Sequence, residues 1–221
     1  WARTGRPVIK EYQDEFFVRH ALLLDTFPSG DALRFETAVS VAASFVLMPR
    51  SQDSLLDLMF VEGRAYTLTQ GRGLGAPPEL LRVLATVAPS PAGGFDTLRE
   101  AVLPNAGRMS GAICVLLEWD AARQRLVGDL RARGIPLRVW VVRDDGDTAA
   151  LDPGPMAADA GNLRVITAAT LARELQQLKG YLLARVYRHE RVMTVMRRAG
   201  NSNRAFSNAA RTRSLASLTS A

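Results

Sequence analysis

The alternation of short apolar runs with helix-like segments constrains the fold of this chain more than any other feature of its sequence. The apolar runs have few polar interruptions, which is typical of strands covered on both faces of a parallel sheet. Between them lie segments with apolar residues three or four positions apart, typical of helices packed on such a sheet. The predicted strands are residues 16–24, 55–61, 65–69, 112–117, 136–142 and 163–166, and the predicted helices are residues 31–48, 77–87, 97–102, 121–133 and 167–196.

One pair of predicted strands interrupts this alternation. Residues 55–61 and 65–69 flank Glu62-Gly63-Arg64, a spacing that indicates a hairpin with one strand at the sheet edge. The acidic, turn-rich segment 144–162 is predicted to be a loop. The pattern predicts an α/β fold with a doubly wound, mostly parallel sheet and an antiparallel edge strand. In such sheets ligands gather at the carboxyl ends of strands where the winding direction switches, and Asp25 follows the first strand.

Composition narrows the class of protein. The chain has 221 residues, of which 48% are hydrophobic, enough for a substantial core. Cys114 is the only cysteine and lies in the run AICVLL, which excludes an internal disulfide and favours a buried thiol in a reducing compartment. No run approaches the roughly 18 apolar residues that cross a bilayer. The first residues also lack the apolar segment of a signal peptide.

The positive charge is concentrated at one end of the chain. The formal net charge is +6, but from Tyr181 to the C-terminus there are eight arginines and a single acidic residue, Glu190. This segment is interpreted as an amphipathic terminal helix with a solvated face, followed by a disordered tail. Contact with anionic lipid or an acidic partner is the alternative, and nucleic acid is less favoured because aromatic residues are sparse.

The first 25 residues, WARTGRPVIKEYQDEFFVRHALLLD, carry a motif that resembles the signature of the domain-of-unknown-function 58 family. That signature has a tryptophan, then Ala-Arg-Thr-Gly, a Glu-Tyr pair and a strand ending in aspartate. A Gly-Gly loop at residues 93–94 and the strand AICVLLEWD extend the resemblance to about residue 185. The matching signature residues are Trp1, Ala2, Arg3, Thr4, Gly5, Glu11, Tyr12 and Asp25.

The resemblance implies a von Willebrand factor A-like domain, a fold used for protein contacts. It divides the chain into a signature segment (1–14), the von Willebrand factor A-like domain (15–185) and a basic C-terminal segment (186–221). Proteins similar to these are associated with MoxR-type AAA+ ATPases and carry membrane-spanning helices before the signature. The implied location is therefore cytoplasmic, with membrane association through segments upstream of Trp1 or through the basic tail.

The resemblance also raises the possibility of a Mg²⁺ site. In the family fold an Asp-x-Ser-x-Ser turn, a threonine in a second loop and a later aspartate supply the hard oxygen ligands that Mg²⁺ prefers. Here Phe27 replaces the first serine and Phe95 replaces the threonine, so two ligands are missing. Either a cation is held weakly, or the site is degenerate and Asp25 hydrogen-bonds backbone amides. The remaining candidate ligands are Asp25, Ser29, Asp96 and Asp120.

The loops at the carboxyl ends of the strands are also predicted to bind a protein partner. Trp119 is the candidate anchor, because aromatic residues are enriched at the centre of interfaces. In the alternative interpretation Trp119 packs over the following helix and Asp120 caps it. The predicted contact residues are Asp25, Phe27, Ser29, Phe95, Asp96, Glu118, Trp119 and Asp120.

Catalytic patterns are sparse. Gly71, Gly73 and Gly75 lie between a strand and a helix, but their spacing lacks the two-residue gap of a dinucleotide loop. The two histidines, His20 and His189, have no companion at metal-ligand spacing. We therefore expect a non-enzymatic interaction domain without a required cofactor. The resemblance implies that this domain serves a MoxR-type ATPase in assembly or maturation of other proteins. The alternatives are an α/β enzyme that binds a nucleotide or phosphate ligand, or a lipid- or nucleic-acid-associated module acting through the arginine-rich tail.

Overall fold

The computed structural model describes residues 18–27, 31–48, 54–71, 75–90, 94–147 and 149–176. The chain divides into two compact units, Trp1–Leu171 and Ala172–Ala221. The strands of the described residues all belong to the first unit. They are β1 (Val18–Leu24), β2 (Ser54–Glu62), β3 (Arg64–Gln70), β4 (Gly111–Leu116), β5 (Leu137–Val142) and β6 (Leu163–Ile166).

The six strands form a single sheet in the order β3-β2-β1-β4-β5-β6. All neighbouring pairs are parallel except β2 and β3, which form the predicted antiparallel hairpin at one edge. The chain winds from β1 to β2 in one direction and returns to place β4 on the other side of β1. The switch in winding direction therefore lies between β1 and β4, and the predicted doubly wound fold is confirmed.

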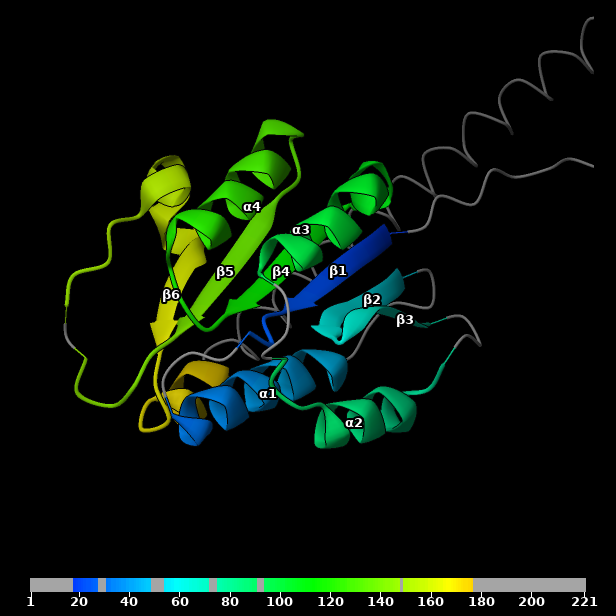
Figure 1. Cartoon of the computed structure of the whole chain (residues 1–221), viewed down its shortest axis with the longest axis horizontal. Helices are drawn as coiled ribbons and strands as arrows, with labels where there is room; N and C mark the ends of the chain where they lie inside the picture. Colours follow the sequence, from blue (N-terminus) through cyan, green and yellow to red (C-terminus); the bar gives the residue numbers. More distant parts are fainter. Residues whose placement is uncertain are drawn as a thin grey trace, which may run out of the picture. The chain divides into compact units, whose positions relative to one another are not determined.

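Helices cover both faces of the sheet, as Figure 1 shows for the first unit. Helices α1 and α2 contact each other, and α1 packs against β1, β4 and β5. On the opposite face α3 packs against β2 and β3, and α4 against β5. The helical elements are α1 (Ala32–Val46), α2 (Pro77–Thr86), α3 (Asp96–Val102) and α4 (Ala121–Ala132), with the 3₁₀ helices η1 (Leu103–Arg108) and η2 (Gly154–Asn162).

The sheet supplies the centre of the core because its inner strands are covered on both faces. Alternate residues of β1 point to opposite faces, and Ala21, Leu22, Leu23 and Leu24 are all fully buried. The thiol of Cys114 on β4 is also fully buried, as expected. Hydrophobic burial on both faces explains why these strands are nearly continuous apolar runs.

The segment 144–162 is not a continuous loop, which corrects the prediction from sequence. Its second half forms η2, with a kink at Asp159, where the backbone leaves helical geometry. Pro155 suits the first turn of a helix, and Met156 is fully buried against the core. Turn-forming residues favour a loop here, but the burial of Met156 stabilises a 3₁₀ helix instead.

Three predicted segments cannot be compared with the structure. The signature residues 1–14, most of the predicted terminal helix 167–196 and the basic segment 186–221 lie outside the described residues. Within the described part of the chain, no helix combines the length and apolar character needed to cross a bilayer.

Candidate functional site

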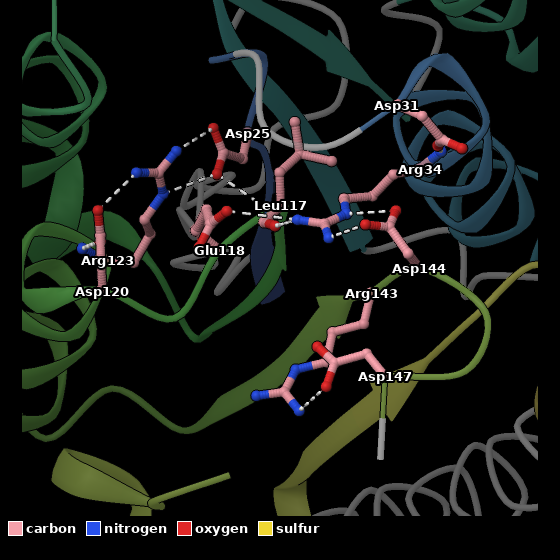
Figure 2. A network of polar contacts seen from close by, with 10 residues as sticks. All are labelled: Asp25, Asp31, Arg34, Leu117, Glu118, Asp120, Arg123, Arg143, Asp144 and Asp147. Atoms are coloured by element: carbon pink, nitrogen blue, oxygen red, sulfur yellow. Dashed lines mark hydrogen bonds and ion pairs between the residues drawn. The ribbon is translucent and has the colours of Figure 1, made fainter. Parts of the chain in front are cut away.

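Four segments lie together at the carboxyl ends of the strands, around the point where the winding direction switches. We call this region the carboxyl edge: residues 25–27 after β1, residues 94–96 at the start of α3, residues 117–120 after β4, and residues 143–147 after β5. Figure 2 shows the polar side chains that connect these loops. Two arginines, Arg34 and Arg123, lie at the centre of this network.

Asp25 is the most buried acidic residue of the carboxyl edge. Its side chain is 0% exposed. Its Oδ1 accepts the backbone N–H of Phe27 at 3.0 Å, and its Oδ2 accepts the backbone N–H of Leu117 at 3.0 Å. Its own N–H donates to the carbonyl of Val115 at 2.9 Å, which continues the pairing of β1 with β4. Asp25 therefore joins the loops after β1 and β4.

Arg123, in the first turn of α4, is the cation that contacts Asp25. Its Nε donates to Oδ2 of Asp25 at 2.9 Å and its Nη2 donates to Oδ1 at 3.3 Å. Its Nη1 donates to Oδ2 of Asp120 at 2.8 Å. One guanidinium thus bridges two carboxylates that come from different loops (Figure 2). Fork-shaped recognition of a carboxylate is the geometry in which arginine differs most from lysine.

The electrostatics of this pair are set by burial. Burial raises the pKa of the Asp25 carboxyl, while Arg123 and the two backbone N–H donors oppose that rise. Burial alone would lower the pKa of Arg123, but Asp25 and Asp120 outweigh this effect and raise it. The guanidinium therefore stays charged, and each partner compensates the desolvation of the other.

Two phenylalanines form the apolar side of this site. The guanidinium carbon of Arg123 lies 4.6 Å from the ring centroid of Phe95, a cation–π contact. The rings of Phe27 and Phe95 meet edge to face, with centroids 6.0 Å apart. Both rings are buried in the core cluster beneath α3 and α4. The substitutions noted in the sequence thus supply the surface on which Arg123 rests.

Arg34 forms a second cluster at the same edge. It lies in the first turn of α1, donates from Nε to Oδ1 of Asp144 at 2.9 Å, and forms an ion pair with the same carboxylate through Nη2. Its Nη1 donates to the carbonyl of Leu117 at 3.2 Å and to Oε1 of Glu118 at 3.3 Å. The hydrogen bond with Asp144 raises the pKa of Arg34. Arg34 therefore connects α1 to the loops after β4 and β5.

Some of the predicted contact residues are buried and others are exposed to solvent. Asp25, Phe27 and Phe95 are buried, so the expectation that they contact a partner directly is corrected by the fold. Asp96, Glu118 and Asp120 have side chains 56%, 45% and 46% exposed, so a partner can reach them. Ser29 lies outside the described residues.

The candidate metal ligands are only partly brought together. Asp25 and Asp120 both contact Arg123, but Asp96 points to Arg125 across 3.8 Å. Among the described residues no group of three or more His, Cys, Asp or Glu side chains is placed to hold a metal ion. The hydrogen bonds expected between Asp25 and backbone amides are present.

The alternative interpretation of Asp120 as a helix cap agrees with the structure, and Trp119 contacts the core cluster and Asp152. Asp120 is the N-cap of α4, and its Oδ1 accepts the backbone N–H of Arg123 at 2.9 Å. Trp119 packs partly buried against the core cluster and donates from Nε1 to the carbonyl of Asp152 at 2.7 Å. A hollow of about 390 Å³ lies beside it, lined by Arg34, Trp119, Asp120, Arg143, Asp147 and Asp152 among others.

The glycines considered for nucleotide binding have a structural explanation at the described positions. Gly71 ends the edge hairpin with φ +125°, and an added Cβ would lie 2.4 Å from the carbonyl oxygen of Ser54. Gly75 has φ +53° and an added Cβ would lie 2.7 Å from the carbonyl oxygen of Thr69. Gly73 lies outside the described residues. Close backbone approach accounts for both described glycines.

Sequence reasoning missed Arg34 and Arg123, although α4 held a signal. Arg123 shares the helical spacing of Leu126, Val127 and Leu130, and all four are buried. A charged residue on the buried face of a helix requires a partner, because an isolated buried charge is costly. That requirement points to an acidic residue at the end of a buried apolar strand, and Asp25 is one such residue.

Comparison with known proteins supports the fold. Proximal thread matrix protein 1 from the mussel byssus matches 74% of this chain with a TM-score of 0.52 and 13% identity, and 45% of that protein is covered. The same protein with a zinc-occupied MIDAS motif matches with a TM-score of 0.52 and 11% identity, over 74% of this chain and 47% of that one. A von Willebrand factor type A protein from Catenulispora acidiphila matches at 12% identity and a TM-score of 0.45, over 74% and 42%.

The two matches to the mussel protein, both with a TM-score of 0.52, show the fold class alone. The domain is an α/β von Willebrand factor A-like fold, and the chain spans less than half the length of the mussel protein that it matches. No protein-family model and no curated protein matches the chain.

Proposed function

We propose that this chain is a non-enzymatic protein-interaction domain that binds its partner with the carboxyl edge of the sheet. The observation that carries the proposal is the arrangement of exposed acidic side chains above a buried ionic network. Asp96, Glu118 and Asp120 reach solvent. Arg34 holds the loop after β4 through Leu117, and Arg123 contacts Asp120 and the ring of Phe95 beside Asp96. A surface held in place before binding loses little conformational entropy when a partner docks. Von Willebrand factor A-like domains generally serve in protein contacts, which supports the same function.

The partner that we propose is a MoxR-type AAA+ ATPase. Support comes from the signature-like residues 1–25, whose resemblance implies an accessory role in the assembly or maturation of other proteins. The acidic carboxyl edge would suit a basic surface on that partner, since complementary charge accelerates association. In this proposal the chain acts in the cytoplasm and is attached to the membrane through other segments of the full-length protein.

We further propose that the metal site of this fold is degenerate in this chain. The mussel protein has a form with a zinc-occupied MIDAS motif. Here both oxygens of Asp25 already accept N–H donors, and the side chains of Phe27 and Phe95 supply no oxygen. With Arg123 bound to Asp25, the residues at this site therefore do not fit a resident divalent cation.

Surface plasmon resonance with an immobilised MoxR-type ATPase from the source organism would test this proposal. The edge variant combines Asp96→Lys and Glu118→Lys, which reverse two exposed charges and leave Asp25 and Arg123 intact. The control is Arg133→Glu, because Arg133 is exposed at the opposite end of α4. We expect at least tenfold weaker binding of the edge variant and near-normal binding of the control. Equal binding by both variants would contradict the edge as the binding surface, and no binding by the unaltered chain would contradict this partner.

A further inference from the structure

We propose that Arg123 is the permanent cation of the carboxyl edge, occupying the place between Asp25 and Asp120 that a divalent ion would otherwise take. The proposal concerns the chain alone and requires no partner. Asp25 follows β1 and Asp120 caps α4, so the two carboxylates come from segments far apart in the sequence. The guanidinium of Arg123 contacts both, through three nitrogens at 2.8 to 3.3 Å (Figure 2).

The acceptor capacity of Asp25 leaves no room for a metal bond. An ionised carboxylate has about four lone-pair positions for hydrogen bonds. Asp25 receives four N–H donors: two from the backbone, at Phe27 and Leu117, and two from the guanidinium of Arg123. Because the side chain is fully buried, solvent cannot exchange for any of these donors. A cation could enter only if Arg123 withdrew.

The apolar wall of the site favours a guanidinium over a hydrated ion. The face of the Phe95 ring lies under Arg123 with 4.6 Å between the ring centroid and the guanidinium carbon. A weakly hydrated, planar cation stacks well on such a face, whereas Mg²⁺ and Mn²⁺ require oxygen ligands. The edge-to-face contact of Phe27 with Phe95 fixes that ring. Phe95 thus contacts the Arg123 guanidinium directly, and Phe27 holds the Phe95 ring in position.

Removing the guanidinium should expose the latent site. In Arg123→Ala, Asp25 and Asp120 would face a space without a cation, and two carboxylates in proximity attract a divalent ion. In Arg123→Lys a positive charge remains, but the two-pronged contact with Asp25 is lost. The two variants therefore separate the effect of charge from the effect of geometry.

The experiment measures thermal unfolding with added MnCl₂ or EDTA, together with Mn²⁺ binding by electron paramagnetic resonance. We expect the unaltered chain and Arg123→Lys to unfold at the same temperature in both additives and to bind no Mn²⁺ at the edge. Arg123→Ala should be stabilised by Mn²⁺ by several degrees, and Arg123→Ala combined with Asp25→Ala should lose that response. If Arg123→Ala does not fold alone, refolding in the presence of Mn²⁺ should restore the native circular dichroism spectrum.

Two results would overturn the proposal. One is Mn²⁺ binding by the unaltered chain that is lost in Asp25→Asn, because Arg123 would then not exclude the ion. The other is an Arg123→Ala protein that gains neither Mn²⁺ binding nor Mn²⁺-dependent refolding, because the guanidinium would then not stand at a cation site.

Discussion

Asp25 shows how a single buried carboxylate can organise an entire sheet edge. Its two oxygens receive the N–H groups of residues after β1 and β4 and the guanidinium of a helix that follows β4. Replacing one member of such a pair leaves the other charge buried without compensation. The contacts of Asp25 are thus more important for stability than any exposed ion pair of the domain.

Asp25→Ala is expected to lower the free energy of unfolding by about 3–5 kcal/mol, because Arg123 would lose its buried partner. Asp96→Ala is the matched control. Its partner, Arg125, is 63% exposed and lies 3.8 Å away, so the loss should be under about 1 kcal/mol. Urea unfolding followed by circular dichroism measures both changes. Similar losses in the two variants would show that Asp25 and Arg123 do not form a stabilising pair.

The stability of Arg123→Ala should depend on pH in a definite direction. Without Arg123, the rise in the pKa of Asp25 caused by burial is opposed only by two backbone donors. An acid whose pKa is raised by folding stabilises the native state below its unfolded pKa, near 3.8 for Asp25. That contribution is lost as pH rises through the folded pKa. The deficit of Arg123→Ala relative to the unaltered chain should therefore grow as pH rises above the unfolded pKa of Asp25, as measured by urea unfolding. A deficit independent of pH would contradict this.

Cys114 should be chemically inert in the native protein. Burial raises the pKa of its thiol to about 12, so the reactive thiolate is scarce at neutral pH. We expect a disulfide reagent to modify it only as fast as the domain unfolds, and denaturing urea to accelerate the reaction to that of a free thiol. Rapid labelling in native buffer would show that β4 opens locally.

At the scale of elements, α1 and α4 begin in the same way. Each has an aspartate N-cap that accepts the N–H of an arginine three residues later: Asp31 with Arg34, and Asp120 with Arg123, both at 2.9 Å. Arg34 then extends to the carbonyl of Leu117 after β4, and Arg123 extends to the carboxylate of Asp25 after β1. The caps follow from the preference for aspartate at this position. The long-range contacts depend on the strand order, which joins segments that are distant in the sequence.

Gly71→Ala should destabilise the edge hairpin more than Gly63→Ala. Both glycines have positive φ, but an added Cβ at Gly71 would lie 2.4 Å from the carbonyl oxygen of Ser54, whereas nothing lies within 4 Å at Gly63. We expect losses of about 2–4 kcal/mol at Gly71 and about 1–2 kcal/mol at Gly63. Thermal unfolding compares them, and equal losses would indicate that the hairpin relaxes around the new methyl group.

The sequence predicted the elements well where burial and periodicity agree. The inner strands are apolar runs because both of their faces are covered. The turn residues Glu62-Gly63-Arg64 predicted the hairpin between β2 and β3 correctly. It failed at residues 154–162, where composition favours a loop but Met156 is buried and a 3₁₀ helix forms. It also placed Asp25 at the correct strand end but did not foresee its partner, because pairing across 98 residues depends on the tertiary fold.

For the whole molecule, the topology of the sheet gathers acidic side chains at one edge of a chain that is basic overall. The chain is basic overall, yet its carboxyl edge presents several acidic side chains to solvent. If Arg123 supplies the cation of this edge, capture of a protein partner should not require divalent ions. Binding in the surface plasmon resonance assay should therefore be unchanged by EDTA and should weaken with added salt. Loss of binding in EDTA would contradict a metal-independent edge.

Leu117 lies between the two arginine clusters, with its N–H bound to Asp25 and its carbonyl bound to Arg34. Any rotation of the backbone here would have to break a hydrogen bond on either side of the residue. Helices α1 and α4, on opposite faces of the sheet, are thus both connected to the backbone of Leu117, α1 through Arg34 and α4 through Arg123 and Asp25. A ligand that binds the neighbouring Glu118 would therefore contact a rigid backbone, and any displacement of that backbone would move α1 and α4 together.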